Sequence, residues 1–69
     1  MTTYHDARER ARALYEATIQ AAEAAEEFVA ADDVTSETPG FDPAQAAARY
    51  TAACEGLWAA VRHLRAVRG

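Results

Sequence analysis

The sequence breaks once, at Thr35-Ser36-Glu37-Thr38-Pro39-Gly40-Phe41-Asp42-Pro43, between two long alanine-rich segments. Proline and glycine together are typical of a turn, because proline cannot continue a helix and glycine adopts backbone angles closed to other residues. Asp42 followed by Pro43 is a typical helix start, since aspartate caps free amides and proline suits the first helical position. A connection of about ten residues favours two antiparallel helices.

Before the break, apolar residues recur with the seven-residue spacing of an amphipathic helix. We expect a helix over about residues 3–31, capped at its start by Thr3, and a loop over about residues 32–41. Tyr4 is taken as position a of the heptad abcdefg. Further apolar residues at e and g make the stripe wider than a two-stranded coiled-coil seam. The a and d residues are Tyr4, Ala11, Thr18 and Ala25, and Ala7, Leu14, Ala21 and Phe28.

After the break, the same spacing predicts a second helix over about residues 42–68. Trp58 occupies position e, and alanines fill most of positions f and g. A helix that is apolar around most of its circumference is usually buried on several sides. We therefore expect the second helix to be the more central one in an assembly. With Ala47 at a, the a and d residues are Ala47, Tyr50, Cys54, Leu57, Val61 and Leu64.

A lone pair of helices cannot enclose a core, and this chain of 69 residues lacks the usual means of compensation. Below roughly 70–80 residues, one core rarely supplies more than about 3–5 kcal/mol. The single cysteine, Cys54, excludes an intrachain disulfide, and no structural zinc site is evident. The predicted fold is all-α: one two-helix antiparallel hairpin over residues 1–69, dimerising into a four-helix bundle or docking on a larger protein.

Large apolar side chains are few, because 19 residues are alanine. Those along the two stripes are the predicted assembly interface. Trp58 is the first candidate among them for an anchor, since a partly exposed tryptophan often contributes most to an interface. The predicted interface residues are Leu14, Tyr15, Phe28, Tyr50, Leu57, Trp58, Val61 and Leu64.

Charge is sorted along the chain, whose formal net charge is −4. Six of the seven arginines lie near the two chain ends, which a hairpin brings together; with Asp6 and Glu9 counted, this end carries +4. Between Arg12 and Arg49 there are eight acidic residues and no basic one. We favour a two-fold dimer of hairpins packed head to tail, with each basic end beside the acidic end of the other copy.

A second interpretation assigns the basic end to phosphate, in a nucleic acid or a phosphorylated ligand, because arginine forms bidentate phosphate contacts. The acidic chain as a whole argues against a nucleic-acid module. No aromatic residue lies among the last three arginines to stack on bases. The candidate anion-binding residues are Arg8, Arg12, Arg62, Arg65 and Arg68.

A third interpretation makes the acidic end the working surface. Carboxylates there would replace phosphates on a basic patch of another protein, as in an inhibitor or adaptor. The ordinary explanation is a solvated acidic face that aids solubility. The candidate docking residues are Glu23, Glu26 and Glu27.

Residues with the spacing of an enzyme site are scarce. There is no glycine-rich phosphate loop, and Cys54 has no histidine at a suitable spacing. No Glu-x-x-His pair, as found in bundle di-metal sites, occurs. Gly56 lies inside the second helix, where it marks a close helix crossing, a ligand contact or a tolerated small residue. We expect no catalytic residue, metal or cofactor, and hence a non-catalytic interaction module acting as adaptor, regulator or inhibitor.

No apolar run approaches the roughly 20 residues of a membrane span, and the first residues are polar. We therefore expect no membrane association and a cytoplasmic location. A single thiol at an apolar position agrees with a reducing compartment.

Overall fold

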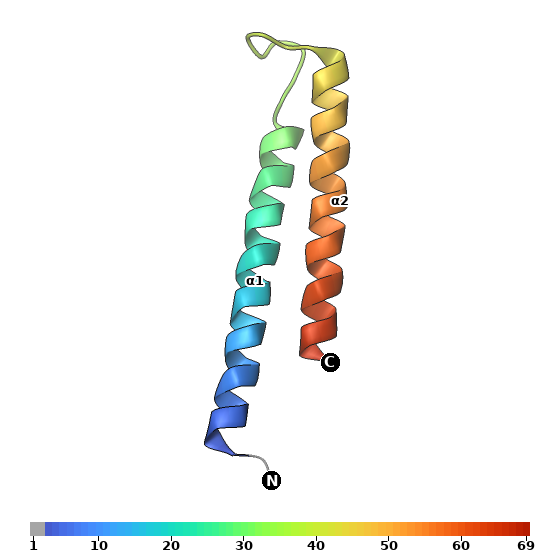
Figure 1. Ribbon diagram of the computed structural model, residues 1–69. Helices are drawn as coiled ribbons and strands as arrows, with labels where there is room; N and C mark the ends of the chain where they lie inside the picture. Colours follow the sequence, from blue (N-terminus) through green and yellow to red (C-terminus); the bar gives the residue numbers. More distant parts are fainter. Residues whose placement is uncertain (1–2) are drawn as a thin grey trace.

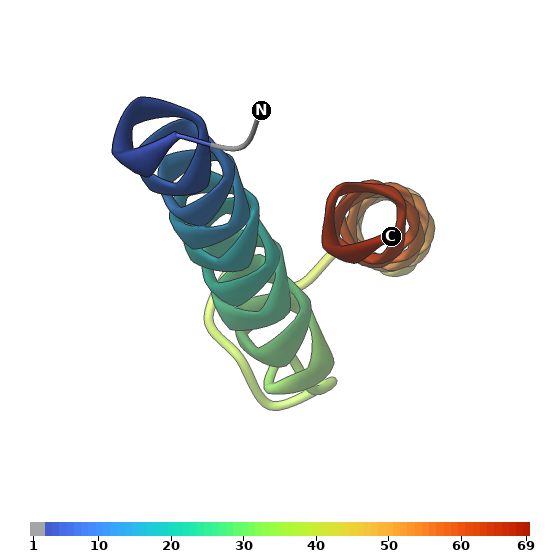
Figure 2. The ribbon, with the colours of Figure 1, turned by 90° about the horizontal axis from the view of Figure 1, so that it is seen from below.

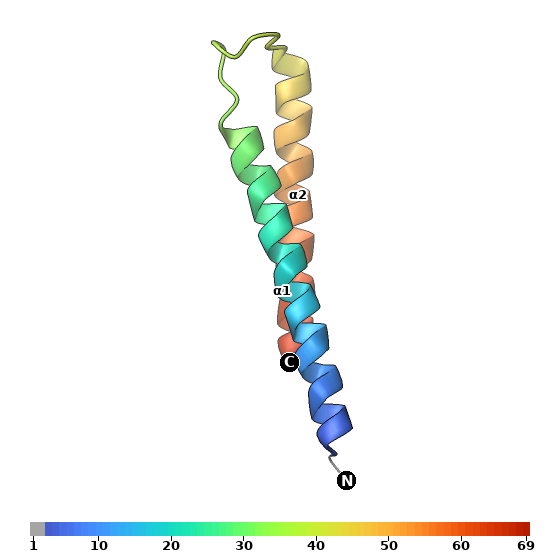
Figure 3. The same cartoon turned by 90° about the vertical axis from the view of Figure 1, so that its left-hand side faces the viewer.

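The computed structural model describes residues 3–69, which form two α-helices and no strand. Helix α1 spans Tyr4–Asp32, and helix α2 spans Pro43–Arg68. Figures 1 and 3, drawn at right angles to each other, show two antiparallel helices side by side along most of their length. The prediction of an all-α chain with two helices packed against each other is confirmed.

Both helices begin with a side-chain cap. The Thr3 hydroxyl accepts a hydrogen bond from the Asp6 amide at 3.1 Å. The Asp42 carboxylate accepts one from the Ala44 amide at 3.0 Å, and Pro43 takes the first helical position. These caps satisfy amides that have no partner within the helix, and they fix where each helix starts.

The loop between the helices is built from two successive tight turns. The Thr38 amide donates to the Thr35 carbonyl, and the Phe41 amide donates to the Thr38 carbonyl, both at 3.0 Å. In the second turn Gly40 follows Pro39 and has φ +74°. A type II turn requires a positive φ of this kind at its third residue. The loop extends past the end of α1 to reach the start of α2 (Figure 1).

The contact between the helices is made mainly of alanine. Ala17 and Ala31 are buried, with 1% and 6% of their surface exposed. At one level two larger side chains meet, because the rings of Phe28 and Tyr50 lie 5.3 Å apart between centroids. The remaining half-buried seam residues are Leu14, Ala21, Ala24 and Ala25 of α1, and Ala46, Ala53, Cys54, Leu57, Ala60, Val61, Leu64 and Val67 of α2.

The seam uses mainly heptad positions d and g, which form one side of the predicted a, d, e and g stripe; the a residues Ala25, Cys54 and Val61 border it and are half-buried. On α1 the g residue Ala17 is buried, whereas the a residues Tyr4, Ala11 and Thr18 are exposed. A stripe that covers a, d, e and g is wider than one neighbouring helix can cover. The seam therefore takes one side of the stripe and leaves the other side in water.

The hairpin is a thin rod rather than a compact domain. Its Cα atoms extend over 58 × 16 × 10 Å. Its radius of gyration is 16.8 Å, compared with about 11 Å for a compact chain of this length. Viewed from one end, the helices form a single layer (Figure 2). No residue of α2 is buried within this layer; its predicted central place concerns an assembly and stays a prediction.

Helix α1 overhangs α2 at the end where the chain termini lie. Arg10 lines one hollow together with Val67, Arg68 and Gly69, so it lies level with the last residues of α2. Figure 1 shows α1 continuing past that level. Tyr4, in the overhang, is 81% exposed. The first turns of α1 thus have no neighbouring helix.

Gly56 does not mark a close helix crossing within the hairpin. A Cβ atom placed on it would have no neighbour within 4 Å. The residue is exposed on α2, and the contact between the helices passes elsewhere.

Candidate functional site

Several large apolar side chains remain exposed because the seam covers only part of each stripe. On α1, Tyr15 is 66% exposed and Val29 is 55% exposed. On α2, Trp58 is 56% exposed. Each lies on the a and e side of its helix, next to the d and g seam. Exposed large apolar side chains that gather on one surface are the candidate site for contacts with another molecule.

The exposed stripes of the two helices lie on the same face of the hairpin. Positions a and e are rotated from the seam in the same sense on both helices. Because the chain direction reverses between antiparallel helices, this rotation points to one side of the pair. We call this side the apolar face. Its apolar and small residues are Tyr4, Ala11, Tyr15, Thr18, Ala22 and Val29 of α1, and Ala47, Cys54, Trp58 and Val61 of α2; Arg8, Thr51, Arg65 and Arg68 lie at the same heptad positions.

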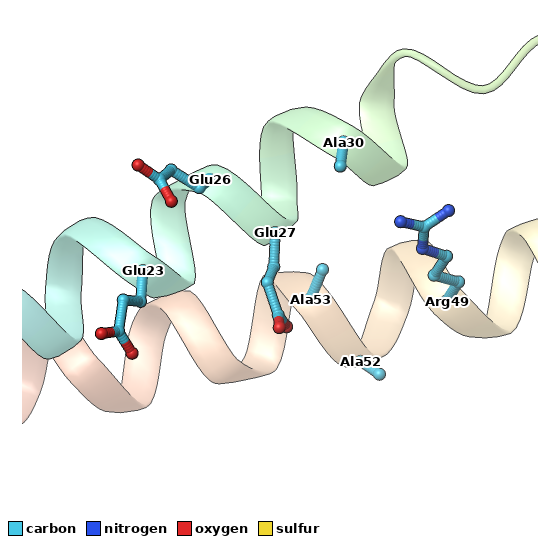
Figure 4. A pocket seen from close by; sticks show the side chains of 7 residues that line it. All are labelled: Glu23, Glu26, Glu27, Ala30, Arg49, Ala52 and Ala53. Carbon is cyan, nitrogen blue, oxygen red and sulfur yellow. The ribbon is translucent and has the colours of Figure 1, made fainter.

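The opposite side, which we call the polar face, supports this geometry. Here residues rotated from the seam in the other sense, among them Glu27 of α1 and Arg49 of α2, line one open groove of about 560 Å³. Figure 4 shows both side chains on this side of the two helices. The complete lining is Glu23, Glu26, Glu27, Ala30, Arg49, Ala52 and Ala53.

The structure divides the predicted interface residues into two groups. Tyr15 and Trp58 are exposed on the apolar face, and the half-buried Val61 borders it. Tyr50 is 40% exposed and contacts Phe28 at the edge of the seam. The others are half-buried between the two helices: Leu14, Phe28, Leu57 and Leu64. These four are partly covered by the neighbouring helix, so the exposed apolar surface is centred on Tyr15 and Trp58.

The three predicted acidic docking residues line the polar groove together, but they do so beside a positive charge. In Figure 4, Glu23 and Glu27 extend along the groove, whereas Glu26 points away from α2. Arg49 lies at the loop end of the same groove. Sequence reasoning missed Arg49, because its proximity to Glu27 depends on the register between the helices. A helical-wheel projection of both helices, oriented with positions d and g at the contact, would have shown Arg49 and Glu27 on the same side of the hairpin.

The predicted basic end is only partly brought together. Arg10 and Arg68 line one hollow between the helices, whereas Arg8 and Arg12 line another on α1 alone, with His5 and Glu9. The His5 imidazole lies 3.2 Å from the Glu9 carboxylate, and both side chains are largely exposed. Such an exposed pair contributes little to stability.

Arg65 and Arg68 lie in the last turn of α2. Cations there offset the negative end of the helix dipole, which gives both arginines a structural reason to be where they are. Arg62 and Arg65 are exposed on α2, outside the hollow that Arg10 and Arg68 share.

Over residues 3–69, no three His, Cys, Asp or Glu side chains come close enough together to hold a metal ion. Within the same range, neither helix combines the length and apolarity needed to cross a membrane. The chain matches no protein-family model, no curated protein and no solved structure.

Proposed function

We propose that this chain is a non-catalytic interaction module that binds other helices through its apolar face and assembles into a four-helix bundle. The observation that carries the proposal is the apolar face itself, to which both helices contribute exposed large side chains. A second copy is the first partner to consider, because it offers the same face. An adaptor, regulator or inhibitor working in the cytoplasm fits a small, acidic helical chain with a single thiol.

The surface area of the hairpin supports assembly. Its accessible surface is 5616 Å², whereas a compact monomer of 7.5 kDa would expose about 4,200 Å². The excess, about 1,400 Å², exceeds the roughly 800 Å² that each partner contributes to a standard interface. Burying one face of the rod would remove an excess of this size.

The proposal is tested by light scattering after size exclusion, with circular dichroism on the same sample. We expect a strongly helical species of about twice the 7.5 kDa chain mass at micromolar concentration, since two-fold dimers are the commonest assemblies. A fully folded helical monomer at that concentration would contradict the proposal. A poorly helical monomer would mean that the apolar face requires a different protein.

A second candidate function is phosphate binding at the basic end. The observation in its favour is the hollow of about 480 Å³ that Arg10 and Arg68 line from different helices. Two guanidinium groups on one hollow suit a phosphate of a nucleic acid or of a phosphorylated ligand.

This second candidate makes its own prediction. Single-stranded and duplex oligonucleotides should bind at ~50 mM salt and dissociate as salt is raised, because phosphate binding releases counterions. Fluorescence anisotropy with labelled oligonucleotides measures this, and Arg10→Gln with Arg68→Gln should abolish it. Arg49→Gln, on the polar face, is the control. Absence of binding at low salt would remove nucleic acids from consideration.

A further inference from the structure

We propose that the apolar face is covered by a second copy of this chain lying head to tail, with a two-fold axis level with Ala17 and Thr18. This inference rests on the proposed self-association and adds its orientation and register. A two-fold axis that reverses the helix direction and brings the apolar faces together must lie between the two apolar faces, perpendicular to the helices, and point from α1 towards α2. It therefore stacks α1 on α1 of the partner subunit, and α2 on α2.

The sequence of α1 is arranged symmetrically about this axis. In an antiparallel pair of identical helices, two residues meet when they are equally far from the axis on opposite sides. Arg8 and Glu26 are equally far from Ala17, and both are exposed. One pair of opposite charge is thus centred on Ala17.

The exposed apolar side chains of α1 have nearly the same centre. Tyr15 on the apolar face and Ile19 at the outer edge of α1, on the same side as Glu26, are equally far from Ala17. Tyr4 and Val29 are centred half a residue before Ala17, an offset of about 0.8 Å at 1.5 Å per residue. The same two-fold contact would therefore cover Tyr4 in the overhang, which is 81% exposed and has no neighbouring helix among residues 3–69. It also places the partner's helix along the whole length of α1.

The register between α1 and α2 extends the axis to the second helix. Phe28 and Tyr50 lie at one level because their rings are in contact. Ala17 precedes Phe28 by as many residues as Val61 follows Tyr50, so Val61 lies level with the axis. Trp58, one turn away on the apolar face, then packs beside Val61 of the partner subunit. The largest exposed side chain of α2 is thereby placed near the centre of the interface, where anchors usually lie.

Charge excludes the opposite orientation. If both hairpins pointed the same way, the two basic ends would lie on each other, and like charges across an interface oppose assembly.

The test is a pair of charge-swapped variants, Arg8→Glu and Glu26→Arg. Each variant alone places like charges at both ends of the α1 pair, and its dimer dissociation constant should rise at least about tenfold. Mixed in equal amounts, the two variants should recover a heterodimer of nearly wild-type affinity. Native mass spectrometry of the mixture measures the species directly, and circular dichroism checks that each variant is helical.

A control variant with a matched change of charge away from the interface is Glu23→Arg, in the groove of the polar face, which should leave dimerisation unchanged. A dimeric wild type whose swapped variants pair without preference would overturn the head-to-tail arrangement alone. Tighter pairing of the Arg8→Glu variant with itself would indicate the opposite orientation. A monomeric wild type would overturn the proposed self-association as well.

A crosslink gives an independent measurement. Thr18 is exposed next to the proposed axis, so Thr18→Cys in a Cys54→Ser background should form a disulfide-linked dimer under mild oxidation. A disulfide joins only Cα atoms that lie about 4.4–6.8 Å apart. The crosslink therefore forms only if the two copies of residue 18 face each other closely. Gln20→Cys, on the polar side of α1, is the control and should remain reduced. Equal crosslinking of both variants would contradict the proposed axis.

Discussion

A Trp58→Ala variant is expected to self-associate at least about 30-fold more weakly than the wild-type chain. Truncating a central aromatic anchor of an interface costs about 2 kcal/mol or more, which corresponds to that factor. Trp58 is 56% exposed within the hairpin, so much of its surface is available to a partner. Sedimentation equilibrium over a dilution series measures the change in the dissociation constant.

The control for Trp58 is His63→Ala, an exposed position on the same helix but outside the apolar face. Trp58 is also the only tryptophan, so the wild-type fluorescence should shift to shorter wavelength as concentration rises and the side chain leaves water. An unchanged dissociation constant together with a lower melting temperature would assign Trp58 to the stability of the single hairpin instead.

The second large effect is expected from Ala17→Glu, which should open the hairpin. Ala17 is only 1% exposed, and the neighbouring helix leaves no space for a solvated carboxylate. An unpaired buried charge costs several kcal/mol, which is comparable to the whole stability of about 3–5 kcal/mol available to so small a core. Glutamate is a good helix former, so helix propensity alone would not account for the loss. Thermal unfolding followed by circular dichroism should lose its cooperative transition.

Ala59→Glu, the same substitution at an exposed position of α2, should change the free energy of unfolding by less than about 0.5 kcal/mol. Ala17→Leu separates size from charge, because overpacking a close contact costs typically about 1–3 kcal/mol. A cooperative transition preserved in Ala17→Glu would mean that the helices are not in close contact at this level in solution.

The fold class could be predicted from the sequence because its signals are local. Thr3, Asp42 and Pro43 act on the amides next to them, and the structure has these residues at the helix starts. Pro39 and Gly40 impose a turn wherever they occur in this order. Each signal depends on a few adjacent residues and on nothing distant.

The facing sides of the helices could not be predicted in the same way. Alanine is nearly neutral in its preference for exposure, and a chain with 19 alanines gives little contrast around the helix. Residues at a, d, e and g all fit a seam by hydropathy. The choice of d and g is a tertiary property: it lets Ala17 and Ala31 approach α2 closely, and it lets the Phe28 and Tyr50 rings meet.

The candidate site shows the same division. Trp58 could be identified from the sequence as an anchor, since it is a large apolar residue among alanines. That Tyr15 lies on the same face as Trp58, and Arg49 in the same groove as Glu27, follows only from the direction and register of the second helix. The loop sets both, and its length in residues does not specify how its two turns orient α2.

The two turns of the loop also bear on the order of events in folding. In an antiparallel hairpin the separation along the chain between facing residues grows steadily with distance from the loop, from Phe28 and Tyr50 to the hollow that Leu14 and Val67 line. Each doubling of that separation adds only about 0.6 kcal/mol of closure entropy, so most of the entropic barrier belongs to the first contact. We therefore expect the conformation at Pro39 and Gly40 to govern how fast the hairpin forms, and contacts at the chain ends, which should form last, to govern how fast it opens.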